Sequence, residues 1–501
     1  MTRLDDEAAV LTALVHPPDW TNPRPAPMYD LVVLGGGTAG LVSAMGAAGF
    51  GARVAIVEQH LLGGDCLNTG CVPSKALLRS ARAIGDIRSA GALGVRVPAP
   101  SVDFPAVMHR MRERRVTIAK HDAAARLQRA GVDVFFGSAR FADPRTVVVD
   151  GSRLRFGRAV IATGGRPAVP PIQGLDAVPF LTSENVFALT ERPSRLLVIG
   201  GGPIGCEMAQ AFARFGAAVT VLHPGHQILP KEDADAASIV RRQMERDGVR
   251  FEQGVSIERV SSDGGEIRLQ YSRANEGSAP VAGHVVGDAL LVAAGRAPNV
   301  EGLDLAAAGI SATKDGVVVT DRLQTTNRRV FASGDVCSKY KFTHVADAQS
   351  RIVLQNALFF GRRKASTLVV PWVTFTDPEI AHVGVSEKDV SRSGGALRTI
   401  TIDLSDVDRA VVDDETDGFV RVHHERGALR GCTIVARHAG EMIGEAAYAI
   451  GHGGTLAALS GTIHPYPTQA EALRKAGDAY RRESLTPGIR RWFARYFRWT
   501  R

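Results

Sequence analysis

Cysteine is scarce in this chain, with five residues among 501, at positions 66, 71, 206, 337 and 432. Secreted domains held by disulfides usually carry a denser and even set, so the count predicts a cytoplasmic protein with one chemically active pair. No apolar run reaches the roughly 18 residues of a membrane-spanning helix. Asp5, Asp6 and Glu7 precede the first apolar stretch, which argues against a secretory signal.

Acidic residues are nearly absent from the C-terminal end. The formal net charge is +8, and residues 481–501 hold seven arginines against one glutamate, or 7 − 1 = +6. The rest of the chain is close to balanced, so we expect no nucleic-acid partner. Residues 486–501 have the pattern of a basic amphipathic helix. Two roles stay open for this tail: contact with an anionic membrane surface, or packing on the body or across a dimer.

A cysteine motif spans residues 63–75, GGDCLNTGCVPSK. Cys66 and Cys71 are five positions apart at an expected helix start, where their sulfurs can approach each other. A disulfide closing so short a loop adds little stability, which favours a redox role. Lys75 lies one turn beyond Cys71 and can stabilise a thiolate or an anionic cofactor. A zinc half-site is the alternative, but no second pair exists to complete four ligands, so no metal centre is predicted.

A dinucleotide-binding fingerprint precedes this motif. A buried strand is expected over residues 29–34, followed by G-x-G-x-x-G, an Ala-rich helix and a second strand that ends at Glu58. The glycines permit a tight turn and close approach of a pyrophosphate, and Glu58 can accept hydrogen bonds from ribose hydroxyls. The candidate residues of this turn and the cysteine motif are Gly35, Gly37, Thr38, Ala39, Gly40, Gly64 and Asp65.

A second fingerprint follows the strand at residues 196–199, with Gly200, Gly202, Ile204 and Gly205 in the turn. Its second strand ends at His223 instead of an acid, which favours NADPH over NADH, with NADH still open. His226 and Lys231 are further candidates for contact with a 2′-phosphate. Two dinucleotide sites flanking a redox pair form an electron-transfer arrangement. Between the fingerprints, residues 76–130 are helical in pattern, with four arginines, at positions 110, 112, 114 and 115, expected on a solvated face.

The cysteine motif resembles the active-site motif of the class I flavoprotein disulfide reductases, which include dihydrolipoyl dehydrogenase, glutathione reductase and mercuric reductase. The resemblance extends over about residues 29–480. It implies an α/β fold with two Rossmann-like FAD and NAD(P) domains plus an α+β C-terminal dimerisation domain, and therefore a homodimer. Cys71 would be the thiolate beside the flavin and Cys66 the thiol that meets the substrate. Lys75 would pair with Glu207.

Other segments match the family in order. By resemblance, Thr163 and Gly164 end the first FAD portion, Gly295 and Arg296 close the nicotinamide domain, and Gly334 and Asp335 form the second FAD signature. His344 either lines the flavin or is a helix-start histidine. The expected divisions are an arm at 1–28 that wraps the surface or a partner, FAD-binding parts at 29–165 and 295–368, an NAD(P)-binding domain at 166–294, a dimerisation domain at 369–485, and the tail.

One departure concerns the acid/base residue that the dimerisation domain supplies. The family places a histidine five positions before a glutamate, here Glu471, and this chain has Tyr466 at that place. A phenol, with an ordinary pKa of about 10, is a poor base at neutral pH, and His464 is a weak substitute because Pro465 fixes its direction. Mercuric reductases also carry tyrosine here. They end in a cysteine pair, however, and this chain has no cysteine after Cys432.

These features predict an FAD-dependent NAD(P)H oxidoreductase that reduces a soft metal ion or a disulfide through Cys66 and Cys71. One alternative is dihydrolipoyl-dehydrogenase-like thiol oxidation with NAD. Another is a flavoprotein that acts at a membrane surface through its C-terminal helix, in which case the protein would be cytoplasmic but peripheral to the membrane.

Overall fold

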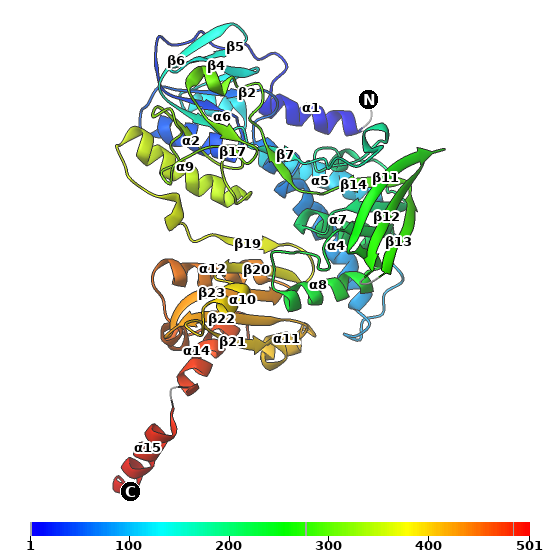
Figure 1. Cartoon of the computed structure of the whole chain (residues 1–501), viewed down its shortest axis with the longest axis vertical. Helices are drawn as coiled ribbons and strands as arrows, with labels where there is room; N and C mark the ends of the chain where they lie inside the picture. The colour runs from blue at the N-terminus through cyan, green and yellow to red at the C-terminus, as the bar shows by residue number, and fades with distance from the viewer. Residues whose placement is uncertain (1–2, 276–277, 484) are drawn as a thin grey trace. The chain divides into compact units, whose positions relative to one another are not determined.

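The computed structural model describes residues 3–275, 278–483 and 485–501. The chain forms two compact units (Figure 1). The first comprises the residues up to Pro224 and Gly248–Leu368, and the second comprises Gly225–Asp247 and Val369–Arg501. The second unit therefore begins its C-terminal part at residue 369, and it also takes a segment from within the predicted NAD(P)-binding region.

A mostly parallel sheet forms the centre of the first unit. Its strand order is β3-β2-β1-β6-β5-β4, and β18 also pairs with β6. The central strands β1 and β2 alternate side chains between two cores, and helices α2 and α9 cover one of them. Burial on both faces explains why these strands are continuously apolar in sequence. The bounds are β1 Tyr29–Leu34, β2 Val54–Glu58, β3 Val132–Phe136, β4 Ala139–Asp143, β5 Thr146–Val149, β6 Ser152–Ile161, β18 Val330–Ala332, α2 Thr38–Gly49 and α9 Thr343–Leu358.

A second parallel sheet has the order β10-β9-β8-β14 and repeats the strand, turn, helix, strand unit of the first. An antiparallel sheet of β11, β12 and β13 accompanies it in the first unit (Figure 1). This repetition bears out the two Rossmann-like halves expected from the paired fingerprints. The bounds are β8 Arg195–Ile199, α7 Pro203–Arg214, β9 Ala218–His223, β10 Val249–Gln253, β11 Val255–Asp263, β12 Glu266–Asn275, β13 Ser278–Gly287 and β14 Ala289–Val292.

The N-terminal arm lies on its own unit. It opens with helix α1, Arg3–Val15, in which Leu11 and Val15 are buried. The proline-rich segment that follows borders β3, the edge strand. Trp20 Nε1 donates to the Val134 carbonyl at 3.1 Å, and Asn22 both donates to and accepts from the Phe136 backbone at 2.8 Å. The arm thus satisfies edge groups that would otherwise face water.

The helices between the two fingerprints are α3 Gly64–Asn68, α4 Cys71–Ser89, α5 Phe104–Ala119 and α6 Ala124–Arg129. The expectation that the arginines of α5 form a solvated face holds for Arg114, which is exposed, and is wrong for Arg112 and Arg115. Arg112 is only 6% exposed and donates to the Leu189 carbonyl at 2.9 Å. Arg115 donates to the Asn68 carbonyl at 3.0 Å, at the last residue of α3. Each guanidinium satisfies backbone acceptors of another segment, a tertiary role that helical spacing does not reveal.

The second unit is α+β. Its antiparallel sheet has the order β19-β20-β23-β22-β21, and helices α12 and α14 pack on it. The strands are β19 Pro371–Thr374, β20 Glu379–Gly384, β21 Arg398–Asp403, β22 Phe419–Glu425 and β23 Ala428–Ala436. The helices are α8 Ala234–Arg246, α10 Glu387–Arg392, α11 Asp408–Val412, α12 Ala439–Gly451, α13 Leu456–Gly461, α14 Glu471–Glu483 and α15 Pro487–Trp499.

Arg421 joins the inserted segment 225–247 to this sheet. Its guanidinium, 9% exposed, contacts carboxylates of Asp233 and Glu387 at 3.3 Å each and also pairs with Asp235. Among the described residues these three acids form the one cluster spaced to hold a metal ion. Because a buried cation already lies among them, the cluster is an ion-pair network.

Among the described residues, none of the helices combines the length and the apolar character that crossing a membrane requires.

Candidate active site

The cysteine motif lies directly against the first glycine turn. Gly63 N donates to the Gly36 carbonyl at 2.8 Å, and Gly37 and Gly63 form a β-bridge. Gly64 has φ of 59°, and a Cβ there would lie 2.6 Å from Gly37 Cα. Only glycine permits this approach without displacing backbone. The contact fixes the cysteine loop at the N-terminal end of α2.

The two glycine turns have the same construction. A Cβ on Gly40 would lie 1.8 Å from the Gly35 carbonyl oxygen, and one on Gly205 would lie 1.9 Å from that of Gly200. Gly37 and Gly202 are the N-caps of α2 and α7. Thr38 and Ala39 begin α2, and Ile204 is in the first turn of α7. Each helix therefore directs free N–H groups at the space beyond its turn, as binding of a pyrophosphate requires.

Glu58 and His223 each end the second strand of one dinucleotide fingerprint. They differ in charge, but each accepts a hydrogen bond from the glycine turn of its own fingerprint. Glu58 Oε2 accepts from Gly36 N at 2.6 Å and Oε1 from His60 N at 2.7 Å. His223 Nδ1 lies 3.2 Å from Gly201 N, the equivalent donor of the second turn. Accepting this bond requires Nδ1 to be unprotonated, so the imidazole is neutral. The first turn has a carboxylate at the ribose position and the second has none.

The predicted family signatures converge beside the first turn. Arg296 Nε donates to Asp335 at 3.0 Å, and the same guanidinium pairs with Asp65 and donates to the Gly165 carbonyl at 2.7 Å. A Cβ on Gly334 would lie 3.3 Å from the Ala39 side chain. Thr163 Oγ1 donates to the Asn299 carbonyl at 2.7 Å, next to Gly164 in sequence. The segments around residues 65, 164, 296 and 335 thus meet near the start of α2.

The donor set fits FAD. The α2 N-terminus suits the pyrophosphate, Glu58 a ribose, and Asp335 a ribityl hydroxyl, since carboxylates accept from sugar hydroxyls. Gly295, with φ of 124°, precedes Arg296 and permits the turn that leads to it.

Cys66 and Cys71 come together because α3 and α4 meet at Gly70. A Cβ on Gly70 would lie 2.8 Å from the Asp65 carbonyl oxygen. Both cysteines are thiols here, with Cys66 partly buried and Cys71 exposed. The hydrogen bond from Cys66, the Thr343 hydroxyl and the nearby Lys75 lower the pKa of Cys71 to about 6. The same bond, together with burial, raises the pKa of Cys66. These contacts therefore favour negative charge on Cys71 over Cys66.

Thr343 is a site residue that the sequence did not reveal. Its Oγ1 lies 3.4 Å from Cys71 Sγ, across 272 positions of sequence. It is also the first residue of α9, whose N-terminal dipole favours an anion. Its neighbour His344 stacks on Phe342 with ring centroids 5.4 Å apart. The histidine is thus at a helix start, and its contact with flavin stays a prediction.

Lys75 and Glu207 form the expected pair. Lys75 Nζ is 2.9 Å from Glu207 Oε2, and Glu207 is only 4% exposed. Glu207 lies on α7, so the pair joins the cysteine helix to the second nucleotide half. A buried carboxylate held by a lysine keeps the ammonium close to Cys71.

In the second unit Tyr466 and Glu471 each have a different hydrogen-bond partner. Tyr466, 71% exposed, donates its hydroxyl to Asp408 at 3.0 Å, which raises the pKa of the phenol. Glu471 is buried and pairs with Arg474, one turn along its own helix. Arg474 lies three positions after Glu471 on the same helix, where the two side chains are neighbours.

His464 is held in place by two partners. Its Nδ1 is 3.1 Å from the Thr462 carbonyl, and its Nε2 is 3.1 Å from both oxygens of Glu445. The side chain is 5% exposed. With both ring nitrogens occupied, this histidine orders the loop of Tyr466 and is poorly placed to take a proton from a thiol.

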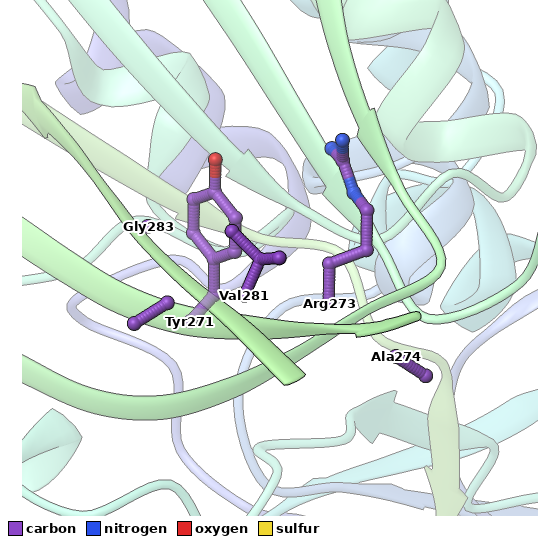
Figure 2. Close-up of a pocket in the computed structure, with 6 residues that line it drawn as sticks. Tyr271, Arg273, Ala274, Val281 and Gly283 are labelled. Atoms are coloured by element: carbon purple, nitrogen blue, oxygen red, sulfur yellow. The ribbon is translucent and has the colours of Figure 1, made fainter. Parts of the chain in front are cut away.

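A separate hollow of about 200 Å³ lies on the β12–β13 hairpin, lined by Tyr271, Arg273, Ala274, Val281, Ala282 and Gly283 (Figure 2). It contains no residue of the glycine turns or the cysteine motif. It therefore takes no part in the site built here.

Comparison with known proteins identifies the family. The pyridine nucleotide-disulphide oxidoreductase model matches residues 29–350, and the dimerisation-domain model of the same family matches residues 370–477. This chain belongs to the pyridine nucleotide-disulphide oxidoreductase family. It is an oxidoreductase, and members of its family use FAD and NAD(P)H.

Individual relatives are similar over most of their length. Mercuric reductase of Lysinibacillus sphaericus is 35% identical, over 89% of this chain and 82% of that protein. Dihydrolipoyl dehydrogenase of Thermus scotoductus is 32% identical, over 91% and 98%. A Cu(II) complex of the HOCl-induced flavoprotein disulfide reductase RclA from Escherichia coli has a TM-score of 0.75 at 29% identity, over 89% and 98%. The disulfide reductase fold and the redox cysteine centre are thereby established.

We expect Gly40→Ala to abolish FAD retention, because its methyl group would collide with the Gly35 carbonyl oxygen. Gly49→Ala on the same helix is the matched control, since a Cβ there meets nothing within 4 Å. Flavin absorbance per purified chain measures the effect. Full flavin content in Gly40→Ala would contradict the role given to this turn.

We expect the two-electron-reduced enzyme to show a long-wavelength thiolate–flavin band at neutral pH. The band should disappear as the pH falls through about 6, the pKa of Cys71, because the thiolate is then protonated. Thr343→Val removes a donor to the thiolate, so the midpoint should rise by roughly one unit. Thr343→Ser keeps the hydroxyl and should retain the original midpoint. An unchanged midpoint in Thr343→Val would show that the hydroxyl does not stabilise Cys71.

Proposed function

We propose that this protein is an NADPH-dependent flavoprotein reductase that delivers electrons through Cys66 and Cys71 to a soft metal ion, with a disulfide as the second class of acceptor. The exposed Tyr466 in place of a basic histidine is the observation that carries the choice of metal ion. Its pairing with Asp408 favours the protonated phenol, which can donate a hydrogen bond but is a poor base. The mercuric reductase relatives support the same choice.

The proposed chemistry assigns different tasks to the two sulfurs. When bound, FAD passes the two electrons of the NADPH hydride to the cysteine pair. The Cys66–Cys71 bond breaks as two electrons and a proton arrive, leaving the Cys66 thiol and the Cys71 thiolate. Lys75 and Thr343 hold the negative charge on Cys71. Cys66, partly buried and protonated, is the sulfur that meets the acceptor once it is deprotonated.

For a mercuric ion, both sulfurs would bind the metal as thiolates, because soft ligands suit soft ions. A second NADPH would supply the two electrons that reduce the bound Hg(II) to Hg(0), and both sulfurs would be released as thiolates. In this proposal Tyr466 of one subunit faces Cys66 of the other, as the family's dimerisation domain implies. A solved structure of similar fold, the flavoprotein disulfide reductase RclA, is a Cu(II) complex.

Thiol oxidation in the manner of dihydrolipoyl dehydrogenase is the second candidate, supported by the relatives of that name. It requires a base that takes a proton from the incoming dithiol. Tyr466 has a raised pKa, and His464 has both ring nitrogens occupied. These two observations favour reduction of a metal ion over oxidation of a dithiol.

The neutral His223 supports NADPH. A carboxylate at this position would accept from a free ribose hydroxyl and repel a 2′-phosphate. His226 and Lys231, the other residues considered for this phosphate, fall in the second unit. Their contact with the nucleotide stays a prediction.

The acceptor is tested by anaerobic reduction with NADPH, followed by addition of Hg(II) or oxidised lipoamide. We expect Hg(II) to restore the oxidised spectrum, with continued NADPH consumption, and lipoamide to act far more slowly. Cys66→Ser should abolish Hg(II) reduction while ferricyanide reduction continues, because ferricyanide takes electrons without the cysteines. Tyr466→His should raise lipoamide turnover. Reaction with neither acceptor would overturn the proposal.

For the nucleotide, we expect His223→Glu to lower the ratio of kcat/KM for NADPH to that for NADH by roughly ten-fold or more, a change of ~1.4 kcal/mol. His223→Gln is the neutral control and should leave the ratio nearly unchanged. Reduction of ferricyanide with each nucleotide provides the measurement. An unchanged ratio in His223→Glu would show that the 2′-phosphate of NADPH does not lie near residue 223.

A further inference from the structure

Helix α15, Pro487–Trp499, has two sharply separated sides. At ~100° per residue, its large apolar residues occupy a sector of about 160°. They are Ile489, Trp492, Phe493, Tyr496, Phe497 and Trp499. Trp492, Phe497 and Trp499 are 61%, 53% and 84% exposed, and no side chain of this fully described helix is buried. The described chain therefore leaves the whole apolar side uncovered.

All the charged residues of the helix are cations and lie on the opposite side. Arg490, Arg491, Arg495 and Arg498 lie there, Arg501 follows, and residues 485–501 contain no acid. Because the helix contains no carboxylate, none of these arginines can form an ion pair within it. Arg490 and Arg495 border the apolar sector, where long side chains can reach phosphate while the aromatic rings stay below them.

The sequence also fixes where this helix begins. Thr486 is the N-cap and accepts from Ile489 N at 3.4 Å, and Pro487 is the first helical residue. Arg498 lies in the last turn, where the helix dipole favours a cation. The helix is thus specified locally and does not depend on packing against the rest of the second unit.

We propose that α15 binds the surface of an anionic lipid bilayer, lying in the plane of the interface with its aromatic sector among the acyl chains. Thirteen residues rise about 20 Å, too short for a hydrocarbon core of ~30 Å, so the helix lies on the membrane and does not cross it. Tryptophan and tyrosine favour the headgroup boundary. Arginines beside them add attraction to anionic headgroups.

Charge complementarity favours lipid over other occupants. A nucleic acid would satisfy the arginines but leave the apolar sector in water. A groove on a second copy of the chain would cover the apolar sector but would have to supply counter-charges for five arginines. An anionic interface supplies both an apolar layer and phosphates at the depth where this helix presents them. The cytoplasmic location expected from the cysteine count would expose the tail to the anionic leaflet.

The test is cosedimentation of the FAD-loaded full chain with vesicles of phosphatidylcholine alone or with phosphatidylserine. We expect binding only with phosphatidylserine, and weakening with added salt. Arg491→Gln, Arg495→Gln and Arg498→Gln together should weaken partitioning on the order of a hundred-fold, since each cation near the surface adds a similar increment. Trp492→Ser with Trp499→Ser should also abolish binding.

The matched control is Arg328→Gln, Arg362→Gln and Arg426→Gln, which removes three exposed arginines elsewhere. It should bind vesicles like the unaltered chain. Ferricyanide reduction should be unchanged in every variant, so a failure here is distinguishable from failure of the reductase proposal. The proposal would be overturned if the chain did not bind vesicles, or if it bound phosphatidylcholine alone equally well. It would also be overturned if deletion of residues 485–501 gave a smaller oligomer and the chain bound no vesicles.

Discussion

The backbone contact between the first glycine turn and the cysteine loop is the constraint on which the rest of the first unit depends. Gly64 can lie against Gly37 only because neither residue has a side chain. The contact places the cysteine pair beside the helix N-terminus that we propose for the FAD pyrophosphate. Electron transfer needs the donor and the acceptor close together. Here the cysteine loop and the first glycine turn lie in contact at the same edge of the sheet.

The polarity of the cysteine pair comes from groups outside its motif. Cys71 receives hydrogen bonds from Cys66 and Thr343 and lies near Lys75, whose position Glu207 secures. Each of these contacts favours charge on one sulfur over the other. An asymmetric pair can hold a stable thiolate on one side while the second sulfur stays available for exchange. The site therefore separates electron storage from contact with the acceptor.

In the second unit, two neighbouring residues of the family's acid/base segment bind to different carboxylates. Tyr466 and His464 sit in one loop, yet the tyrosine bonds to Asp408 and the histidine to Glu445. The exposed phenol is left for an incoming subunit or substrate, and the buried imidazole holds the loop. Such a division suits an acceptor that needs coordination more than proton abstraction.

The sequence by itself determined the features that depend on local spacing. The two glycine turns, the helix start at Cys71, the Lys75–Glu207 pair expected from the family, and the amphipathic tail all follow from residues close together or from a motif. Only the tertiary structure decided the partners of Thr343, Arg112 and Tyr466. These hydrogen bonds join segments that are far apart in the sequence, which helical or strand periodicity does not encode, so position in space, not in sequence, assigns them.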